Sequence, residues 1–164
     1  SDAHLTKLEF AAKYLKPKIV CEYEYLLLFD GDAELPDEKV LDFESLVETM
    51  RKNYLHIGSL SLLAGSVPKW QIQGATSEQI VVDNFVVWKT STWLRAWSLL
   101  QEFAFKAKHF GRLPWRCLLG VDAKNTAILH DHAVLHTGEI QTLPEQTTDD
   151  ELLAEKVRED FGCV

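Results

Sequence analysis

The chain has 164 residues, of which 46% are hydrophobic and 26% charged, as expected for a single globular domain with enough apolar side chains to fill a core. Its formal net charge of -8 argues against a nucleic-acid or anionic-membrane partner, because phosphate binding requires clustered Lys and Arg. No apolar stretch approaches the length of a membrane span, so we predict no membrane span in this chain.

Hydrophobic spacing predicts the elements in chain order. Residues 5–15 form a helix that ends before Pro17. Residues 23–29 are a nearly continuous apolar run, typical of a central strand covered on both faces of a sheet. Asp42 caps the next helix. The apolar face of that helix comprises Phe43, Leu46, Val47 and Met50.

The rest of the chain alternates between strands and helices. Ser91 or Thr92 caps a helix rich in tryptophan, and Asp149 or Asp150 caps a last, strongly charged helix. The remaining segments alternate in the way that predicts strands: 55–63, 69–73, 79–88 and 126–136. This order predicts an α/β fold, a mixed sheet flanked by helices. Ligands of such sheets bind beyond the carboxyl ends of the strands.

Asp30 and Asp32 flank Gly31 at the end of the predicted strand 23–29. Glycine lets the backbone turn so that both carboxylates face one point, and Mg²⁺ and Mn²⁺ prefer such oxygen ligands. A cation there would neutralise a diphosphate leaving group. The alternative is an ordinary Asp-Gly turn, and the triplet alone favours that turn.

The histidines of the strand 126–136 offer a second group of ligands. In a regular strand His130, His132 and His136 share one face, but residues four apart lie roughly 13 Å from each other, which disfavours a three-histidine zinc site. We interpret His130 and His132 as the polar face of an edge strand. His136 stands at the predicted strand end, where one histidine could complete a metal shell.

Asp83 is a lone acid inside the apolar stretch 79–88. An acid in such a place is costly unless it is paired or functional, so it is a candidate general base. The equal alternative is a bulge residue beside Asn84. The spacing of Trp88, Trp93 and Trp97 favours core packing over sugar stacking.

Three blocks of the chain resemble a plant and algal family of uncharacterised proteins labelled "lysine-ketoglutarate reductase trans-splicing related", a distant relative of the GT-A glycosyltransferases. The blocks are FAAKYLKPKIVCEYEYLLLFDGDAEL, VVDNFVVWKTSTWLRAWSLLQ and AILHDHAVLHTGEIQTL. The resemblance implies a GT-A-like domain over residues 1–148, followed by a charged helix over 149–164. It implies that Asp30 and Asp32 bind Mn²⁺ or Mg²⁺ together with a nucleotide-sugar, and that His136 joins the metal shell.

The chain departs from the family pattern in two ways. Pro114 stands about where the family carries an acid, so Asp122 and Asp83 are the remaining candidates for the base that activates the acceptor. Too few residues precede Asp30 for the usual βαβ half, so we expect a GT-A-like sheet that lacks most of the N-terminal nucleotide-binding half, either as a fragment or as a minimal version of the fold. Kinship with Golgi-type enzymes points to the secretory pathway.

Two functions are therefore predicted. The first is a metal-dependent glycosyltransferase that moves a sugar from a nucleotide-sugar donor to the hydroxyl of a carbohydrate acceptor. The second is a non-catalytic domain of the same fold that binds a carbohydrate or a partner protein.

Overall fold

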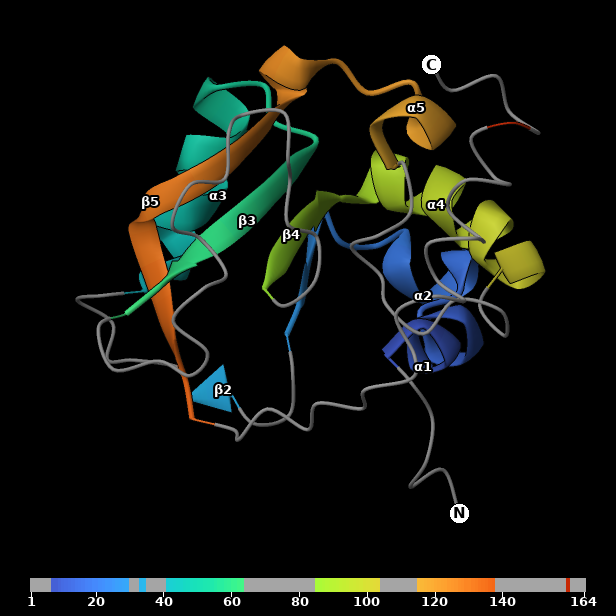
Figure 1. Ribbon diagram of the computed structural model, residues 1–164, viewed down its shortest axis with the longest axis horizontal. Helices are drawn as coiled ribbons and strands as arrows, with labels where there is room; N and C mark the ends of the chain where they lie inside the picture. The colour runs from blue at the N-terminus through green and yellow to red at the C-terminus, as the bar shows by residue number, and fades with distance from the viewer. Residues whose placement is uncertain are drawn as a thin grey trace.

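The computed structural model describes residues 7–29, 33–34, 41–63, 85–103, 115–137 and 159, and Figure 1 shows their arrangement. The helices are α1 (Lys7–Tyr14), α2 (Pro17–Val20), α3 (Phe43–Lys52), α4 (Thr90–Phe103), α5 (Trp115–Leu119) and the short 3-10 helix η2 (Ala123–Asn125). The strands are β1 (Tyr25–Leu28), β2 (Ala33–Glu34), β3 (Ile57–Leu62), β4 (Val86–Lys89) and β5 (Thr126–His136).

The strands form a mixed sheet in the order β1-β4-β3-β5-β2. β4 runs antiparallel to both β1 and β3, β3 runs parallel to β5, and β2 runs antiparallel to β5. The predicted α/β class with a mixed sheet and flanking helices is confirmed. No described helix is both long and apolar enough to span a membrane.

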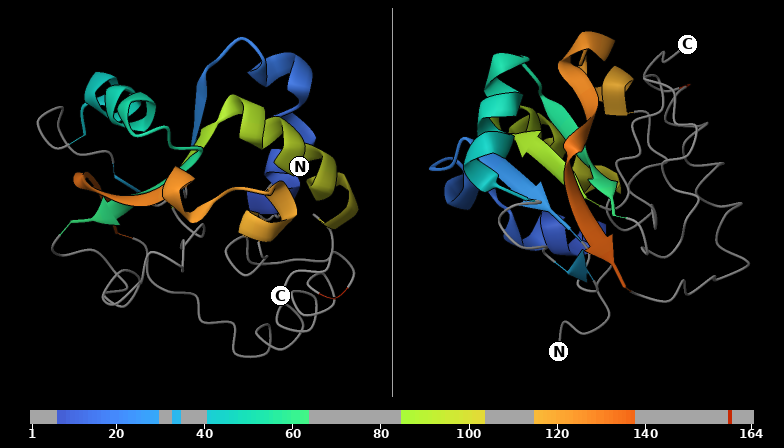
Figure 2. Two further views of the ribbon diagram at one scale, coloured as in Figure 1. Left: turned by 90° about the horizontal axis from the view of Figure 1, so that it is seen from above. Right: turned by 90° about the vertical axis from the view of Figure 1, so that its left-hand side faces the viewer.

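Side chains that alternate along the strands build two separate cores. Trp88 and Val86 pack with α1, α4 and α5, whereas Val87 between them packs with Leu46 and Met50 of α3. Figure 1 and the left view of Figure 2 accordingly show α3 set apart from the group formed by α1, α2 and α4. The sheet is therefore covered on both faces, by different helices.

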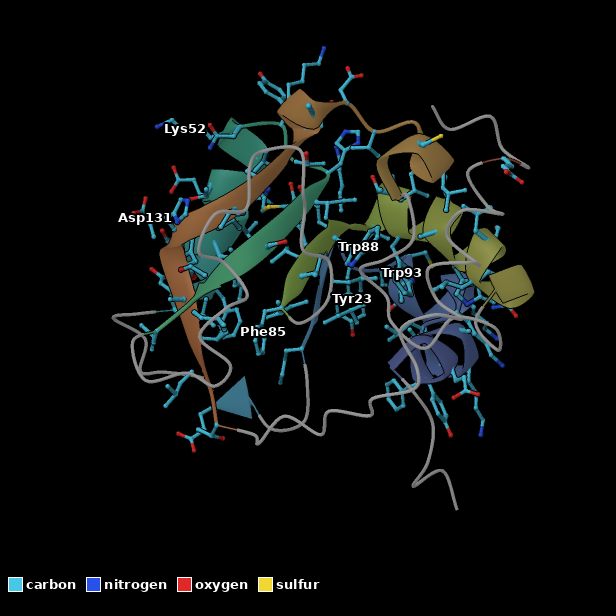
Figure 3. All side chains as sticks on the ribbon, in the orientation of Figure 1. Tyr23, Lys52, Phe85, Trp88, Trp93 and Asp131 are labelled. Atoms are coloured by element: carbon cyan, nitrogen blue, oxygen red, sulfur yellow. The ribbon has the colours of Figure 1, made fainter. Side chains whose placement is uncertain are left out.

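The first core is fixed by tryptophans. Trp88 and Trp93 are fully buried and meet edge to face, with ring centroids 5.6 Å apart, between β4 and α4 (Figure 3). The indole Nε1 of Trp93 donates a hydrogen bond to the Leu15 carbonyl at 3.0 Å, which ties α4 to the end of α1. The prediction that Trp88 and Trp93 belong to the core is confirmed.

Local chemistry explains several of the observed element ends. The Asp42 carboxylate accepts hydrogen bonds from the amides of Glu44 and Ser45, so its predicted role as the cap of α3 is confirmed. Pro17 begins the short helix α2, a position where its missing amide hydrogen costs nothing. The predicted helix 5–15 and strands 55–63 and 126–136 correspond to α1, β3 and β5.

Three details differ from the predictions. The apolar run 23–29 contains β1, which is at the edge of the sheet because, among the described strands, it pairs only with β4, and the four residues of β1 are half-buried. Thr92 is not a helix cap: α4 begins at Thr90, directly after β4, and Thr92 is buried inside its first turn. Phe43 does not join the buried face of α3, since half of its surface is exposed.

Other predictions lie outside the described residues. These are the strand 69–73, the first part of 79–88 and the last helix, of which only Glu159 is described and is helical. The division into residues 1–148 and 149–164 therefore stays a prediction. Of the described cysteines, Cys117 is disulfide-bonded and Cys21 is free and exposed.

Candidate functional site

One end of the sheet brings together the segments that adjoin the predicted site residues. The strand directions place the carboxyl ends of β1, β3 and β5 at this end, together with the first residues of β4 and β2. In Figure 1 it is the lower end of the sheet. Ligands of open α/β sheets bind at ends of this kind.

Of the predicted site residues at this end, the structure describes only the backbone of His136. Asp30, Asp32 and Asp83 lie outside the described residues. The described residues next to them in the chain are Phe29, which follows β1, Ala33, which begins β2, and Phe85, which precedes β4. The backbone of His136 is described as the last residue of β5, so its predicted position at a strand end is confirmed.

The backbone pairing of β2 and β5 connects two of these segments. Ala33 lies directly opposite His136 in the antiparallel register, and Glu34 lies opposite Leu135. Paired Cα atoms in such a ladder are about 4.5–5.5 Å apart, and one trans peptide link of about 3.8 Å joins Asp32 to Ala33. Asp32 directly precedes Ala33 in the sequence, so the pairing of Ala33 with His136 is the described contact nearest in the chain to the Asp-Gly-Asp segment.

The chain between β1 and β2 shows that the sheet curls at this end. Five residue steps lead from Leu28 to Ala33, which limits their Cα atoms to about 18 Å. In a flat sheet, four strand spacings alone would separate β1 from β2 by about 19 Å, and β5 extends well beyond the level of Leu28. The far edge of the sheet must therefore bend toward β1.

A bulge in β5 provides this bend. Along β3, Leu60 pairs with Leu129 but the next residue, Ser61, pairs with Ala133, so residues 130–132 are additional in β5. A bulge of this kind bends its strand and increases the local twist. Figure 1 shows β5 changing direction part-way along its length, and Figure 3 labels Asp131 at that corner.

The bulge corrects our prediction for His130 and His132. His130 is exposed but His132 is buried, with 4% of its surface accessible, and its Nε2 lies 3.3 Å from the Thr49 hydroxyl of α3. The two histidines do not form one polar face, because the inserted residues break the alternation on which that prediction depended. Among the described residues, no group of three or more His, Cys, Asp or Glu side chains could hold a metal ion.

Asp122 lies at the wrong end of the sheet to serve the candidate site. Asp122 precedes η2 and the first residue of β5, whereas His136 is the last residue of β5. The length of β5, about 30 Å, therefore lies between Asp122 and His136. Its carboxylate forms an exposed ion pair with Lys124 at 3.1 Å. Asp122 is therefore excluded as the base for this site, and Asp83 is the candidate that remains.

The clearest pKa shifts also occur at that opposite end. Partial burial lowers the pKa of His56, and the positive charges of Lys89 and Arg95 lower it further, while Asp122 acts in the other direction. The Nδ1 atom of His56 is buried without a hydrogen-bond partner. The Arg51 guanidinium lowers the pKa of Glu24 through a charge-assisted hydrogen bond, with Nε 3.0 Å from Oε1. His56 precedes β3 and Glu24 precedes β1, so these groups do not face the candidate site.

A protein-family model described as "Protein of unknown function (DUF707)" matches residues 1–85, which is more than half of the chain. The chain belongs to this family. The DUF707 match includes Asp30, Asp32 and Asp83, and it ends one residue before β4, so β5 with His136 lies outside it. No curated protein and no solved structure matches the chain. The description of the DUF707 family assigns no activity.

Proposed function

We propose that this chain is a metal-dependent glycosyltransferase domain that moves a sugar from a nucleotide-sugar to an acceptor hydroxyl. The observation that supports the proposal best is the pairing of Ala33 with His136, because Ala33 directly follows the Asp30-Gly31-Asp32 segment in the sequence. The position of this pair at the ligand-binding end of the sheet gives further support.

The donor set suits Mn²⁺ or Mg²⁺. Asp30 and Asp32 would supply carboxylate oxygens, the ligands that these cations prefer, and His136 would add an imidazole nitrogen. When bound, the cation would neutralise the negative charge that develops on the diphosphate as it leaves. A bound cation would allow a chain of net charge -8 to hold a phosphate ligand.

Asp83 would act as the general base if the reaction inverts the sugar. Its carboxylate would accept the proton of the acceptor hydroxyl while the acceptor oxygen forms a bond to the anomeric carbon. The bond from that carbon to the diphosphate oxygen would break, and its electron pair would leave with the nucleoside diphosphate. In the sequence Asp83 stands two residues before Phe85, and Phe85 precedes β4 at the same end of the sheet.

Calorimetric titration of Mn²⁺, with and without UDP, tests the proposal. We expect the wild type to bind Mn²⁺, UDP to strengthen that binding, and the Asp30→Ala/Asp32→Ala double variant to lose it. Asp122→Ala is the matched control, because it removes an exposed carboxylate at the opposite end of β5 and should leave binding unchanged. An absence of binding in the wild type would contradict the metal site.

Turnover separates an enzyme from a non-catalytic domain that binds a carbohydrate or a partner protein. We expect slow hydrolysis or transfer from a sugar nucleotide in the presence of Mn²⁺, and a large loss of rate in Asp83→Asn with Mn²⁺ binding retained. Binding of Mn²⁺ and UDP without turnover of any sugar nucleotide would favour the non-catalytic domain.

A further inference from the structure

The bulge in β5 determines how the last residues of that strand meet β2. Before the bulge, Ala127 and Leu129 face the core beside α3, and after it Val134 does so. His132 also lies on this side, since it contacts Thr49 of α3. The bulge adds three residues, 130–132, to β5. Because this number is odd, odd-numbered side chains face the core before the bulge and even-numbered side chains face it afterwards, and the strand also bends.

A bulge leaves backbone groups without partners in the strand ladder, and such groups must be satisfied elsewhere. Ser61 of β3 supplies a side-chain donor to two carbonyls of the bulge. Its hydroxyl donates to the carbonyl oxygens of His130 and His132, at 3.2–3.3 Å, so that one proton is shared between both ends of the bulge. The adjacent contact between Thr49 and His132 anchors the same segment to α3.

We propose that Ser61 is a positioning residue of the candidate metal site: its hydroxyl holds the bulge of β5, and with it the bend that places His136 opposite Ala33. The backbone hydrogen bond that follows the bulge agrees with this role: the Leu63 amide of the chain after β3 donates to the Val134 carbonyl of β5 at 2.9 Å. The inference rests on the proposed function, since His136 needs this position only if it binds the metal. Nothing in the sequence around Ser61 indicates the role, because a serine in a strand is ordinary.

Two measurements on Ser61→Ala test the role. The first is the Kd of Mn²⁺ by calorimetry, for which we expect weakening by about tenfold, the lower end of what supporting groups behind metal ligands contribute. The second is hydrogen exchange without metal, in which the Leu63 amide should lose protection. The His56 amide, which donates to the Asn125 carbonyl at the other end of the strand pair, should keep its protection.

Ser59→Ala is the matched control, because Ser59 lies two residues earlier on β3 and pairs with Ile128, outside the bulge. It should leave both the Mn²⁺ affinity and the Leu63 protection close to those of the wild type. If Ser61→Ala does not fold, Ser61→Thr and Ser61→Val form a second pair of nearly equal shape that differs in the hydroxyl. We then expect Thr to retain the Mn²⁺ affinity and Val to lose about tenfold.

The outcomes distinguish this inference from the proposed function. Mn²⁺ binding by the wild type together with unchanged affinity in Ser61→Ala, or equal affinity in Ser61→Thr and Ser61→Val, would overturn the role of Ser61 and leave the metal site intact. An absence of Mn²⁺ binding by the wild type would overturn both. Loss of Mn²⁺ affinity and of Leu63 protection in Ser61→Ala, with neither lost in Ser59→Ala, would establish the positioning role of Ser61.

Discussion

Ala33 and His136 face each other across the ladder between β2 and β5, although they are far apart in the sequence. The pairing links the segment that follows Asp32 to the last residue of the longest strand. It depends on the curl of the sheet, since a flat sheet would hold β1 and β2 too far apart for the short connection between them. The candidate site is thus a property of the sheet's shape as much as of its residues.

Gly58→Ala should destabilise the protein by about 1–3 kcal/mol, as overpacking of a close-packed core typically does. A Cβ atom at Gly58 would lie 2.8 Å from both the Leu129 Cδ1 and the Met50 Sδ, so two core side chains would have to move. Urea unfolding measures the change. Met50→Ala in the same chain should relieve part of the cost, and a double-mutant cycle without any coupling between positions 50 and 58 would contradict this explanation.

Trp93→Phe should cost about 2–3 kcal/mol of unfolding free energy, because it removes buried ring surface and leaves the Leu15 carbonyl without its indole donor. Trp97→Phe is the matched control. Trp97 is only partly buried, and its acceptor, the Ala12 carbonyl, also receives a hydrogen bond from Gln101. We expect a loss of about 1 kcal/mol there. Equal losses in the two variants would show that the Leu15 hydrogen bond is unimportant.

His56 should make the protein less stable in mild acid. Its pKa is lowered in the folded state, mainly by burial, so the unfolded chain binds more protons between the folded pKa and the unfolded value of about 6.5. Stability should therefore be fully retained above about pH 6.5 and should fall as the pH decreases through the folded pKa of His56.

Urea unfolding between pH 5 and pH 8 checks this dependence. His56→Gln should flatten the profile in that window. A profile of His56→Gln that matches the wild type would mean that His56 titrates equally in the folded and unfolded states.

Local sequence patterns predicted much of the fold. β5 has the predicted bounds because apolar residues stand on both sides of the bulge, at 127–129 and 133–135, and α3 begins at its predicted cap because Asp42 offers an acceptor to two free amides. The run 23–29 was placed wrongly in the sheet, since continuous apolar character also suits an edge strand whose two faces are both covered by helices. Strand order is a long-range property that no local run encodes.

The candidate site was less predictable for the same reason. The types and spacing of Asp30, Asp32 and His136 suggested a metal, but a site shared by them requires the register between β2 and β5. The bulge that sets this register contains no glycine or proline to mark it. Its buried histidine, His132, looks like a surface residue in the sequence, and only its contact with Thr49 explains why it is tolerated inside.

Under the proposed function, His136 and the Asp-Gly-Asp segment bind one cation. Pulsed electron paramagnetic resonance of Mn²⁺ bound to the protein detects such a histidine ligand, because a coordinated imidazole adds a nitrogen modulation to the echo decay. We expect this modulation in the wild type and in His130→Ala, and its loss in His136→Ala. Bound Mn²⁺ without nitrogen modulation in the wild type, or with the modulation retained in His136→Ala, would contradict the claim.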